Sequence, residues 1–311
     1  MKQIEVNHLT KKYNSLTAVD GINLTAEDNE LLAVVGPDGA GKTSLFRSIC
    51  GLIGFDDGEV RIGSYDLSES FDKIKPLLGY MPQQFSLYPD LSVEENLHFY
   101  AGLFGLNKEE FNKRKERLYN FSGLGAFRNR RAQNLSGGMK QKLALSCNLI
   151  HNPKILILDE PTTGVDPLSR RQFWEILKSL CQSGSTVIVS TPYMDEVALA
   201  DRTIFMHCGK KLAEGAPDEL IAMYEGDLYR LEIEPTAQQM KKFDNLKGLS
   251  ARRFGASIHL YVSSGIGEDE IRRRLDQIDI DSSRLEKITA ELEDVFIQLM
   301  GAEPELENII E

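Results

Sequence analysis

The chain has 311 residues, enough for one large domain and one small one. Hydrophobic residues make up 41% and charged residues 27%, which is ordinary for a globular protein. The 47 Asp and Glu against 36 Lys and Arg give a net charge of −11. This balance argues against a general nucleic-acid binder, which needs a basic face to release counterions from phosphate, so we expect no nucleic-acid partner.

No stretch of the sequence is apolar over the roughly 20 residues that a membrane-spanning helix needs. The N-terminus also lacks the apolar core of a signal peptide. The four cysteines are far apart and form no Cys-x-x-Cys pair, which is typical of reduced thiols rather than of disulfides or a zinc site. We therefore expect a cytoplasmic protein that reaches a membrane only through a partner.

Strands and helices alternate along the first two thirds of the chain, which predicts an α/β sheet. The predicted strands lie at 4–9, 21–26, 31–35, within 53–63, 155–158 and 186–190. A glycine-rich loop follows 31–35 and leads into a helix over 42–51. Ser92 and Glu95 form a capping box that begins a helix over 93–103. Further helices are predicted over 107–121, from Ser136 to about 152, and after Asp166 and Pro167.

The pattern changes after Gly215-Ala216-Pro217. Strands and helices then follow in the order β-α-β-β-α-β, which is compatible with a small ferredoxin-like α+β domain. The elements are a strand from 227, a helix over 236–246, strands over 250–254 and 257–263, a helix over 268–278, a strand near 285–288 and a helix to 300. We expect domains at 1–222, with a helical subdomain at about 84–150, and at 223–301, before an acidic tail at 302–311.

The segment Gly36–Thr43, Gly-Pro-Asp-Gly-Ala-Gly-Lys-Thr, matches the phosphate-loop pattern Gly-x-x-x-x-Gly-Lys-Thr. It lies between an apolar strand and a helix, which is the context that this loop requires. Its glycines let backbone N–H groups converge on phosphate at the N-terminus of a helix. Lys42 is expected to reach the β- and γ-phosphates and Thr43 to bind Mg²⁺.

Asp159 and Glu160 end the apolar strand 155–158. Ligands of α/β sheets bind at such strand ends. We expect Asp159 to hold Mg²⁺ and Glu160 to act as the general base toward the attacking water. Together with the phosphate loop, this pair predicts a nucleoside triphosphatase without saying which one.

The stretch Leu135-Ser136-Gly137-Gly138-Met139-Lys140-Gln141 narrows the class. Ser136 and the N–H groups of Gly137 and Gly138 form a second potential anion site at the N-terminus of a helix. Over roughly residues 2–225 the sequence here resembles the ABC ATPase family, whose signature is Leu-Ser-Gly-Gly-x-x-Gln. The resemblance implies a cassette with a RecA-like core, an antiparallel β subdomain and a helical subdomain.

The resemblance also implies the parts of an ATP site. In this family the signature of one cassette faces the phosphate loop of a second, so ATP closes a dimer that hydrolysis reopens. The residues implied to contact the chain's own ATP are Tyr13, Gly36, Pro37, Asp38, Gly39, Ala40, Gly41, Lys42, Thr43 and Ser44. Those implied to contact the partner's ATP are Ser136, Gly137, Gly138 and Gln141. Gln83 matches the glutamine that touches Mg²⁺ and the lytic water, and acts with Glu160 and Lys42.

Three of these assignments leave an alternative. Tyr13, implied to stack on adenine, is also explained as a packing aromatic on a hairpin. Gln84 stands beside Gln83, and a glutamine here is also explained as a solvated loop amide. Asp166 matches the family's D-loop but is equally a helix cap, and both roles can hold at once.

One position departs from the family pattern Ser-Thr-His-x-Met-Asp-Glu. The chain has Ser190-Thr191-Pro192-Tyr193-Met194-Asp195-Glu196, so Pro192 replaces a histidine that contacts the γ-phosphate in the family. Proline offers no donor and no titratable group, although it suits the first turn of a helix capped by Thr191. We therefore expect slow hydrolysis at the chain's own site and a heterodimer with a histidine-bearing partner. A homodimer stays open.

Segments 79–83, 86–97 and Leu292-Glu293-Asp294-Val295-Phe296 resemble the daunorubicin-resistance and multidrug exporter branch. There the permease is a separate polytopic chain, implied to meet the surface around 84–105 and to hold the cassette at the inner face of the cell membrane. Import stays an alternative. So does a soluble ABC ATPase outside transport, which a single compact cassette disfavours. The third is a regulatory subunit that binds ATP with little hydrolysis, which Pro192 favours and Glu160 opposes.

Overall fold

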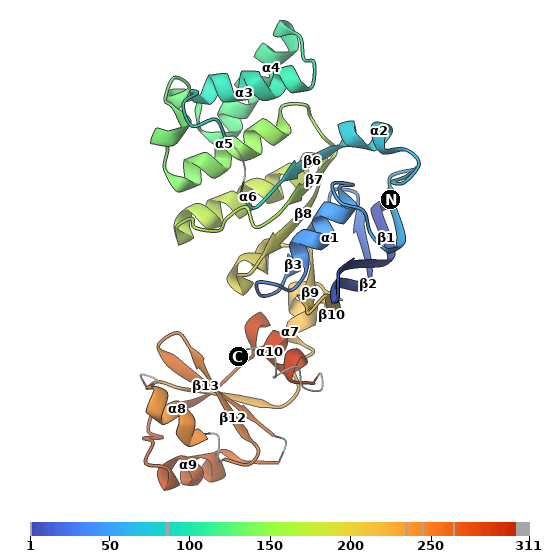
Figure 1. The fold of residues 1–311 in the computed structure, drawn as a ribbon. Coiled ribbons are helices and arrows are strands. Elements are labelled where there is room, and N and C mark those ends of the chain that lie inside the picture. The colour runs from blue at the N-terminus through green and yellow to red at the C-terminus, as the bar shows by residue number, and fades with distance from the viewer. Residues whose placement is uncertain (1, 85–86, 234–235, 244–245, 264, 303–311) are drawn as a thin grey trace. The chain divides into compact units, whose positions relative to one another are not determined.

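The computed structural model describes residues 2–84, 87–233, 236–243, 246–263 and 265–302 (Figure 1). The chain forms two compact units, Met1–Asp218 (unit 1) and Glu219–Glu311 (unit 2). The predicted domain boundary after residue 222 lies four residues beyond this division into compact units. It describes functional domains and stays a prediction. The predicted acidic tail lies outside the described residues from 303 onward. No helix in the described ranges is long and apolar enough to span a membrane.

Unit 1 is built on a six-stranded sheet in the order β10-β9-β3-β8-β7-β6. Five strands are parallel to one another, namely β3, β6, β7, β8 and β9. The sixth, β10, pairs antiparallel with β9 at one edge of the sheet. Strands β3, β7 and β8 are buried along their whole length, which explains their unbroken apolar sequences. The strands are β3 Leu31–Val35, β6 Leu78–Met81, β7 Ile155–Leu158, β8 Thr186–Thr191, β9 Arg202–His207 and β10 Lys210–Gly215.

A second, antiparallel sheet in the order β2-β1-β4-β5 shares one hydrophobic core with helix α1 and the six-stranded sheet. Phe46 of α1, Leu24 of β2 and Val34 of β3 all lie in this core. Helix α6 packs on β8 and β3. The bounds are β1 Lys2–Tyr13, β2 Leu16–Glu27, β4 Asp57–Ile62, β5 Tyr65–Asp66, α1 Lys42–Ile49, α2 Phe71–Ile74 and α6 Pro167–Gln182.

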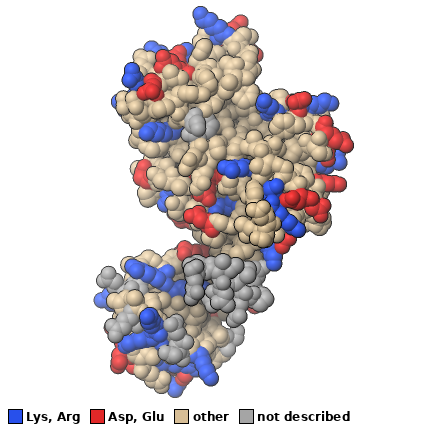
Figure 2. All heavy atoms as spheres, viewed as in Figure 1, with Lys and Arg blue, Asp and Glu red and all other residues tan. Residues whose placement is uncertain are grey.

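Three helices form a separate cluster with its own core: α3 Val93–Leu103, α4 Lys108–Ser122 and α5 Gly137–Leu149 (Figure 1). The predicted capping box is confirmed: Glu95 N donates to Ser92 Oγ at 3.2 Å, and Ser92 N donates to the Glu95 carboxylate at 2.7 Å. Charged side chains of both signs share the visible face of unit 1 (Figure 2). The predicted α/β core with antiparallel and helical additions is thus confirmed.

Unit 2 contains a four-stranded sheet in the order β12-β13-β11-β14, in which all neighbours are antiparallel. This order and the crossover helices α8 and α9 confirm the predicted ferredoxin-like topology. Helix α10 follows the last strand. The bounds are β11 Asp227–Leu231, α8 Ala237–Phe243, β12 Leu249–Phe254, β13 Ser257–Val262, α9 Glu268–Gln277, β14 Leu285–Ile288 and α10 Leu292–Ala302, after α7 Pro217–Ile221. Residues 244–245 of the predicted helix 236–246 lie outside the described residues.

Candidate nucleotide-binding site

The loop from Gly36 to Gly41 joins β3 to α1 and packs closely against neighbouring backbone. A Cβ at Gly36 would lie 2.1 Å from the carbonyl oxygen of Met206, and one at Gly41 would lie 2.1 Å from that of Ala18. Gly41 also has φ +101° at the N-cap of α1, a conformation that favours glycine. These contacts leave no room for a side chain at either position, so both ends of the loop are confined to glycine next to the N-terminus of α1.

Lys42 is the first residue of α1, and only 3% of its surface is exposed. Its Nζ donates to the carbonyl oxygens of Gly36 at 2.7 Å and Pro37 at 2.9 Å. The same Nζ lies 3.0 Å from Oε1 of Glu160, which is 6% exposed. The ammonium group is therefore held inside the loop by two carbonyls and a buried carboxylate.

Asp159 and Glu160 follow directly on β7. Ser190 of β8 joins them, because its Oγ donates to Asp159 Oδ1 at 2.8 Å and accepts from Glu160 N at 2.9 Å. Burial raises the pKa of Asp159, and hydrogen bonds from Ser190 and Thr43 oppose that rise. Glu160 has φ +46°, a backbone conformation that is uncommon outside glycine and clusters at functional sites.

The two glutamines after β6 differ in what they contact. Gln83 Nε2 donates to Glu160 Oε2 at 2.9 Å, and the hydroxyl of Thr163 donates to the same oxygen at 3.3 Å. Gln84 lines a different cavity, described below, and not the pocket around Lys42. The geometry thus brings Gln83 to Glu160.

One pocket of about 370 Å³ gathers most of the predicted site. Tyr13 borders it with 44% of its surface exposed, which disfavours the alternative of a packing aromatic. Neither Asp159, which is fully buried, nor Pro192 lines this pocket. The lining residues are Tyr13, Leu16, Ala18, Asp38, Gly39, Ala40, Gly41, Lys42, Thr43, Ser44, Gln83 and Glu160.

The predicted signature lies elsewhere in unit 1, at the start of α5. Ser136 is exposed and caps the helix, accepting from Met139 N at 3.4 Å. Gly138 is buried against α6, and a Cβ there would lie 2.8 Å from Ser169 Oγ. None of the residues 136–138 lines the pocket around Lys42. One chain therefore presents the phosphate loop and the signature as two separate surfaces.

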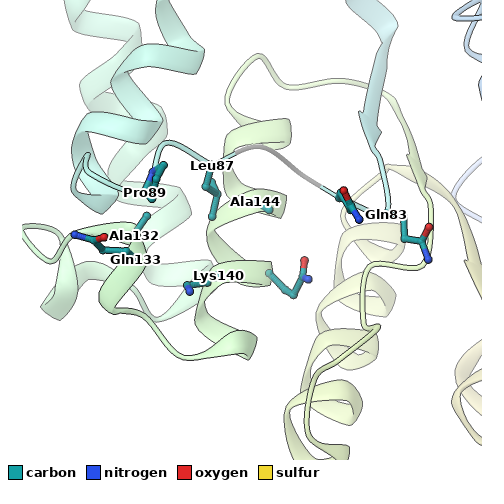
Figure 3. A pocket seen from close by; sticks show the side chains of 9 residues that line it. Gln83, Leu87, Pro89, Ala132, Gln133, Lys140 and Ala144 are labelled. Carbon is teal, nitrogen blue, oxygen red and sulfur yellow. The ribbon is translucent and has the colours of Figure 1, made fainter.

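Gln141 of α5 borders a second cavity of about 370 Å³, between the segment after β6 and the helical cluster (Figure 3). Leu87 and Pro89 approach it from one side and Lys140 and Ala144 from α5. Gln83 lines both cavities. Gln83 therefore lies between the pocket around Lys42 and the cavity beside the helical cluster.

Asp166 caps α6, accepting from Ser169 N at 2.9 Å, and Pro167 occupies the first helical position. The hydrogen bond from the Ser169 backbone lowers the pKa of Asp166. The helix-cap role is therefore present. The side chain is exposed, so the implied D-loop role stays a prediction.

The expectation that Thr191 caps a helix beginning at Pro192 is wrong. β8 runs through Thr191, Tyr193 is still extended at φ −97° and ψ 115°, and a 3₁₀ helix begins only at Met194. The physical reason is that a residue before proline disfavours the helical region and prolongs the strand. Thr191 Oγ1 instead accepts from Tyr193 N at 3.1 Å, which fixes the turn around Pro192.

A buried polar cluster surrounds Glu196, which is 7% exposed and was not predicted from the sequence. Glu196 Oε2 accepts from Thr191 Oγ1 at 2.5 Å and from Thr162 Oγ1 at 3.0 Å. Arg170 Nη1 lies 3.5 Å from Glu196 Oε1. The four residues come from three segments, so no local pattern in the sequence announces the cluster.

The largely parallel sheet, the phosphate loop before α1, the acidic end of β7 and the helical cluster with an exposed Ser136 at the start of α5 together match the architecture of an ATP-binding cassette. Residues 19–163 match the ABC transporter family model. The chain belongs to the family of ABC transporter ATP-binding proteins. The predicted resemblance to this family is confirmed.

Three relatives illustrate the likeness. The chain is 42% identical over 236 residues to the probable multidrug ABC transporter ATP-binding protein YbhF of Escherichia coli, covering 76% of this chain and 40% of that protein. It is 35% identical over 307 residues to the Nod factor export ATP-binding protein I of Paraburkholderia xenovorans, covering 96% and 97%. It is 34% identical over 259 residues to the daunorubicin/doxorubicin resistance ATP-binding protein DrrA of Streptomyces peucetius, covering 83% and 77%. The chain thus spans two fifths of YbhF but most of the other two.

A solved structure agrees with the fold. The dimeric post-hydrolysis state of the ATP-binding cassette MJ0796, bound to ADP and Pi, superposes with a TM-score of 0.62 at 28% identity. The match covers 68% of this chain and 98% of that chain.

Proposed function

We propose that this chain binds and hydrolyses ATP as the nucleotide-binding subunit of an ABC exporter and works as one half of a dimer that encloses ATP. The observation that carries the proposal is the pocket in which Lys42, Gln83 and Glu160 converge beside the phosphate loop. The multidrug and export names of the relatives support the direction of transport.

In this proposal the phosphates of ATP take over the partners of Lys42. The β- and γ-phosphate oxygens replace the carbonyls of Gly36 and Pro37, and Lys42 leaves Glu160. The freed Glu160 carboxylate accepts a proton from the attacking water as the water oxygen forms a bond to the γ-phosphorus. The bond from that phosphorus to the β–γ bridging oxygen breaks at the same time, and ADP leaves with the bridging oxygen. Gln83, already 2.9 Å from Glu160, orients that water. Tyr13 stacks on adenine at the mouth of the pocket.

The residues present suit Mg²⁺. Oδ2 of Asp159 is buried and has no hydrogen-bond partner within the described residues, and Mg²⁺ favours sites with one or two carboxylates plus substrate phosphates. Thr43, Gln83 and Asp159 would hold the ion, which neutralises charge on the β- and γ-phosphates. Ser190, by donating to Oδ1 of Asp159, leaves the other oxygen available.

A second cassette completes each site in this proposal. Ser136, Gly137, Gly138 and Gln141 contact the ATP held by the partner, and Asp166 lies at the dimer interface. The exposed Ser136 at the N-terminus of α5 supports this, because a helix N-terminus favours anions. Because Pro192 offers no donor, we infer that the chain's own site is slow and that the natural partner is a histidine-bearing cassette.

The remaining partner is a separate polytopic permease, which would hold the chain at the inner face of the cell membrane. We propose that its cytoplasmic loop meets the surface around 84–105, next to the cavity between Gln83 and α5 (Figure 3). The shared lining by Gln83 supports this, because a loop bound there contacts a residue that also contacts Glu160.

Steady-state ATP turnover by the purified full chain tests the proposal, with Glu160→Gln and Pro192→His measured beside it. We expect slow wild-type turnover, a loss of about 10²-fold or more in Glu160→Gln, and a gain in Pro192→His. Fast wild-type turnover that Pro192→His leaves unchanged would overturn the degenerate site and favour a homodimer. ATP binding without any Glu160-dependent turnover would favour the regulatory subunit instead.

A further inference from the structure

Glu196 is a buried carboxylate that matches the last position of the family pattern but has no part in the roles proposed above. It is the last residue of the switch segment, residues 191–196, in which Pro192 stands. Its Oε2 accepts from two hydroxyls of different segments, Thr191 at the end of β8 and Thr162 after β7. Burying a carboxylate is costly unless its oxygens are paired, so this arrangement calls for a reason.

The contacts of Glu196 lead to the catalytic base in two short paths. Thr162 is followed by Thr163, whose hydroxyl donates to Glu160 Oε2 at 3.3 Å. Thr191 is preceded by Ser190, whose Oγ accepts from Glu160 N at 2.9 Å. Glu196 therefore ties together the two segments that fix the backbone and the carboxylate of Glu160.

The third contact of Glu196, with Arg170 of α6 (the Arg170 arm), is incompletely formed. Arg170 Nη1 lies 3.5 Å from Glu196 Oε1, and both atoms are buried without a hydrogen-bond partner among the described residues. Trp174, one turn further along α6, has a buried Nε1 that forms no hydrogen bond of good geometry among the described residues, although it lies close enough to Glu196 to oppose the rise in the pKa of that carboxyl. The Arg170 guanidinium stacks on the Tyr193 ring at 4.2 Å and lies 3.7 Å from the exposed carboxylate of Asp195. A donor and an acceptor thus face each other and need only a small shift to bond.

That shift would move a functional element. Arg170 lies in the first turn of α6, which Asp166 caps and against which Gly138 packs through Ser169. Closing the gap between Arg170 and Glu196 draws this turn toward the switch segment. With no imidazole at position 192, positioning is what the switch segment can contribute to hydrolysis.

We propose that Glu196 is a positioning residue for ATP hydrolysis, which holds Thr162, Thr191 and, through Arg170, the first turn of α6 in the arrangement that lets Glu160 act. The proposal rests on the proposed ATPase function. It predicts that loss of the Arg170 arm lowers the rate of hydrolysis and leaves nucleotide binding at the phosphate loop intact, because none of these residues lines the pocket around Lys42.

Glu196→Gln is the discriminating variant. Its amide oxygen can still accept from Thr162 and Thr191, but its NH₂ group would face the Arg170 guanidinium as donor against donor. We expect kcat to fall about 10- to 100-fold, the scale of a misplaced catalytic group, with the Kd for ADP within about threefold of wild type. Arg170→Met should do the same, and the double variant should be no slower than either single one.

The matched control is Glu30→Gln, which breaks another partly buried Glu–Arg pair in unit 1. Arg202 Nε donates to Glu30 Oε1 at 2.7 Å. Both residues lie at the ends of β3 and β9 where these strands begin, whereas the phosphate loop follows the opposite end of β3. This variant should lose stability without losing kcat. Equal kcat in Glu196→Gln and wild type, or a rise in Kd that matches the fall in kcat, would overturn the proposal.

Hydrogen exchange of the full chain decides the matter without relying on activity. In Glu196→Gln, the amides of 162–170 and 191–199 should exchange faster than in wild type, whereas Glu30→Gln should leave them unchanged. Unchanged exchange in Glu196→Gln contradicts the proposal even if every variant hydrolyses ATP. Absent turnover in wild type would instead refute the proposed ATPase function while the exchange data still test Glu196.

Discussion

The buried charged cluster at the end of β7 in unit 1 and the one around Asp294 in unit 2 differ in how completely they are paired. In unit 1, Asp159 has one buried oxygen without a hydrogen-bond partner among the described residues, and Lys42 and Glu160 border an open pocket. In unit 2, Asp294 is fully buried and both its oxygens accept hydrogen bonds: Oδ1 from Tyr261 at 2.8 Å, with His259 Nδ1 also at 2.8 Å, and Oδ2 from Glu291 N at 2.9 Å.

This difference in pairing distinguishes a cluster that can bind a ligand from one that only holds two elements of the fold together. A satisfied buried network fixes one structure and has nothing left to bind with. A buried oxygen that faces no donor is explained by something that arrives later, such as an ion. Asp294 thus attaches the start of α10 to β13 and accounts for the acidic residue in Leu292-Glu293-Asp294-Val295-Phe296. Asp159, in contrast, has an oxygen that can accept a further partner.

The largest expected effect contrasts one residue from each cluster. Lys42→Ala removes the cation that meets the phosphates and should lower ATP turnover about 10²- to 10³-fold. Asp294→Asn should leave turnover within about twofold of wild type, because it touches no residue of the pocket. Phosphate release by the full chain measures both. A similar loss in the two variants would erase the distinction between the clusters.

A smaller effect is expected on the stability of unit 2. Asp294→Ala leaves the half-buried Tyr261 hydroxyl and the buried His259 ring without their acceptor, which should lower the local free energy of opening by about 1–3 kcal/mol. Hydrogen exchange of β13 and α10 amides measures this opening directly. The exposed Asp269→Ala serves as control, with an expected change of about 0.5 kcal/mol or less. Equal protection in both variants would show that the network does not hold α10.

The smallest effect is a pH dependence of unit 1. Burial raises the pKa of Glu196, against hydrogen bonds from Thr191 and Thr162. The folded state therefore binds this proton more tightly than the unfolded state, so the free energy of unfolding falls as pH rises above the ordinary value of 4.5 toward the raised pKa. Glu196→Gln should lack this part of the fall. Urea unfolding followed by the fluorescence of Trp174, the single tryptophan, gives the free energy of unfolding of both proteins at each pH. If this free energy changes with pH equally in wild type and Glu196→Gln, the pKa of Glu196 is not the cause.

The sequence was sufficient wherever a short segment carried its own physical constraint. The unbroken apolar strands, the Ser92 capping box and the Asp166-Pro167 helix start were all predicted and found. So was the phosphate loop at the end of β3. These features depend on residues within about four positions of one another in the sequence. They can therefore be predicted before any tertiary structure is known.

Features that depend on long-range pairing were not predictable in the same way. β1 extends to Tyr13 through the polar Lys11 and Lys12 because these two residues pair with β2. No alternation of apolar and polar residues predicts this extension of the strand. The cluster of Glu196 with Thr162 and Arg170 joins segments 26 to 34 positions apart along the chain. The helix expected at Pro192 failed because strand β8 continued through the preceding residue.

The contact between Gly138 and Ser169 has a consequence for how such a chain diverges. With 2.8 Å between a Cβ at 138 and the Ser169 hydroxyl, the two positions share one small volume. A side chain at 138 is tolerable only if residue 169 shrinks or the two helices separate. Position 138 should therefore stay glycine in nature as long as position 169 carries a side chain at least as large as serine, and a lineage that enlarges residue 138 must first reduce residue 169.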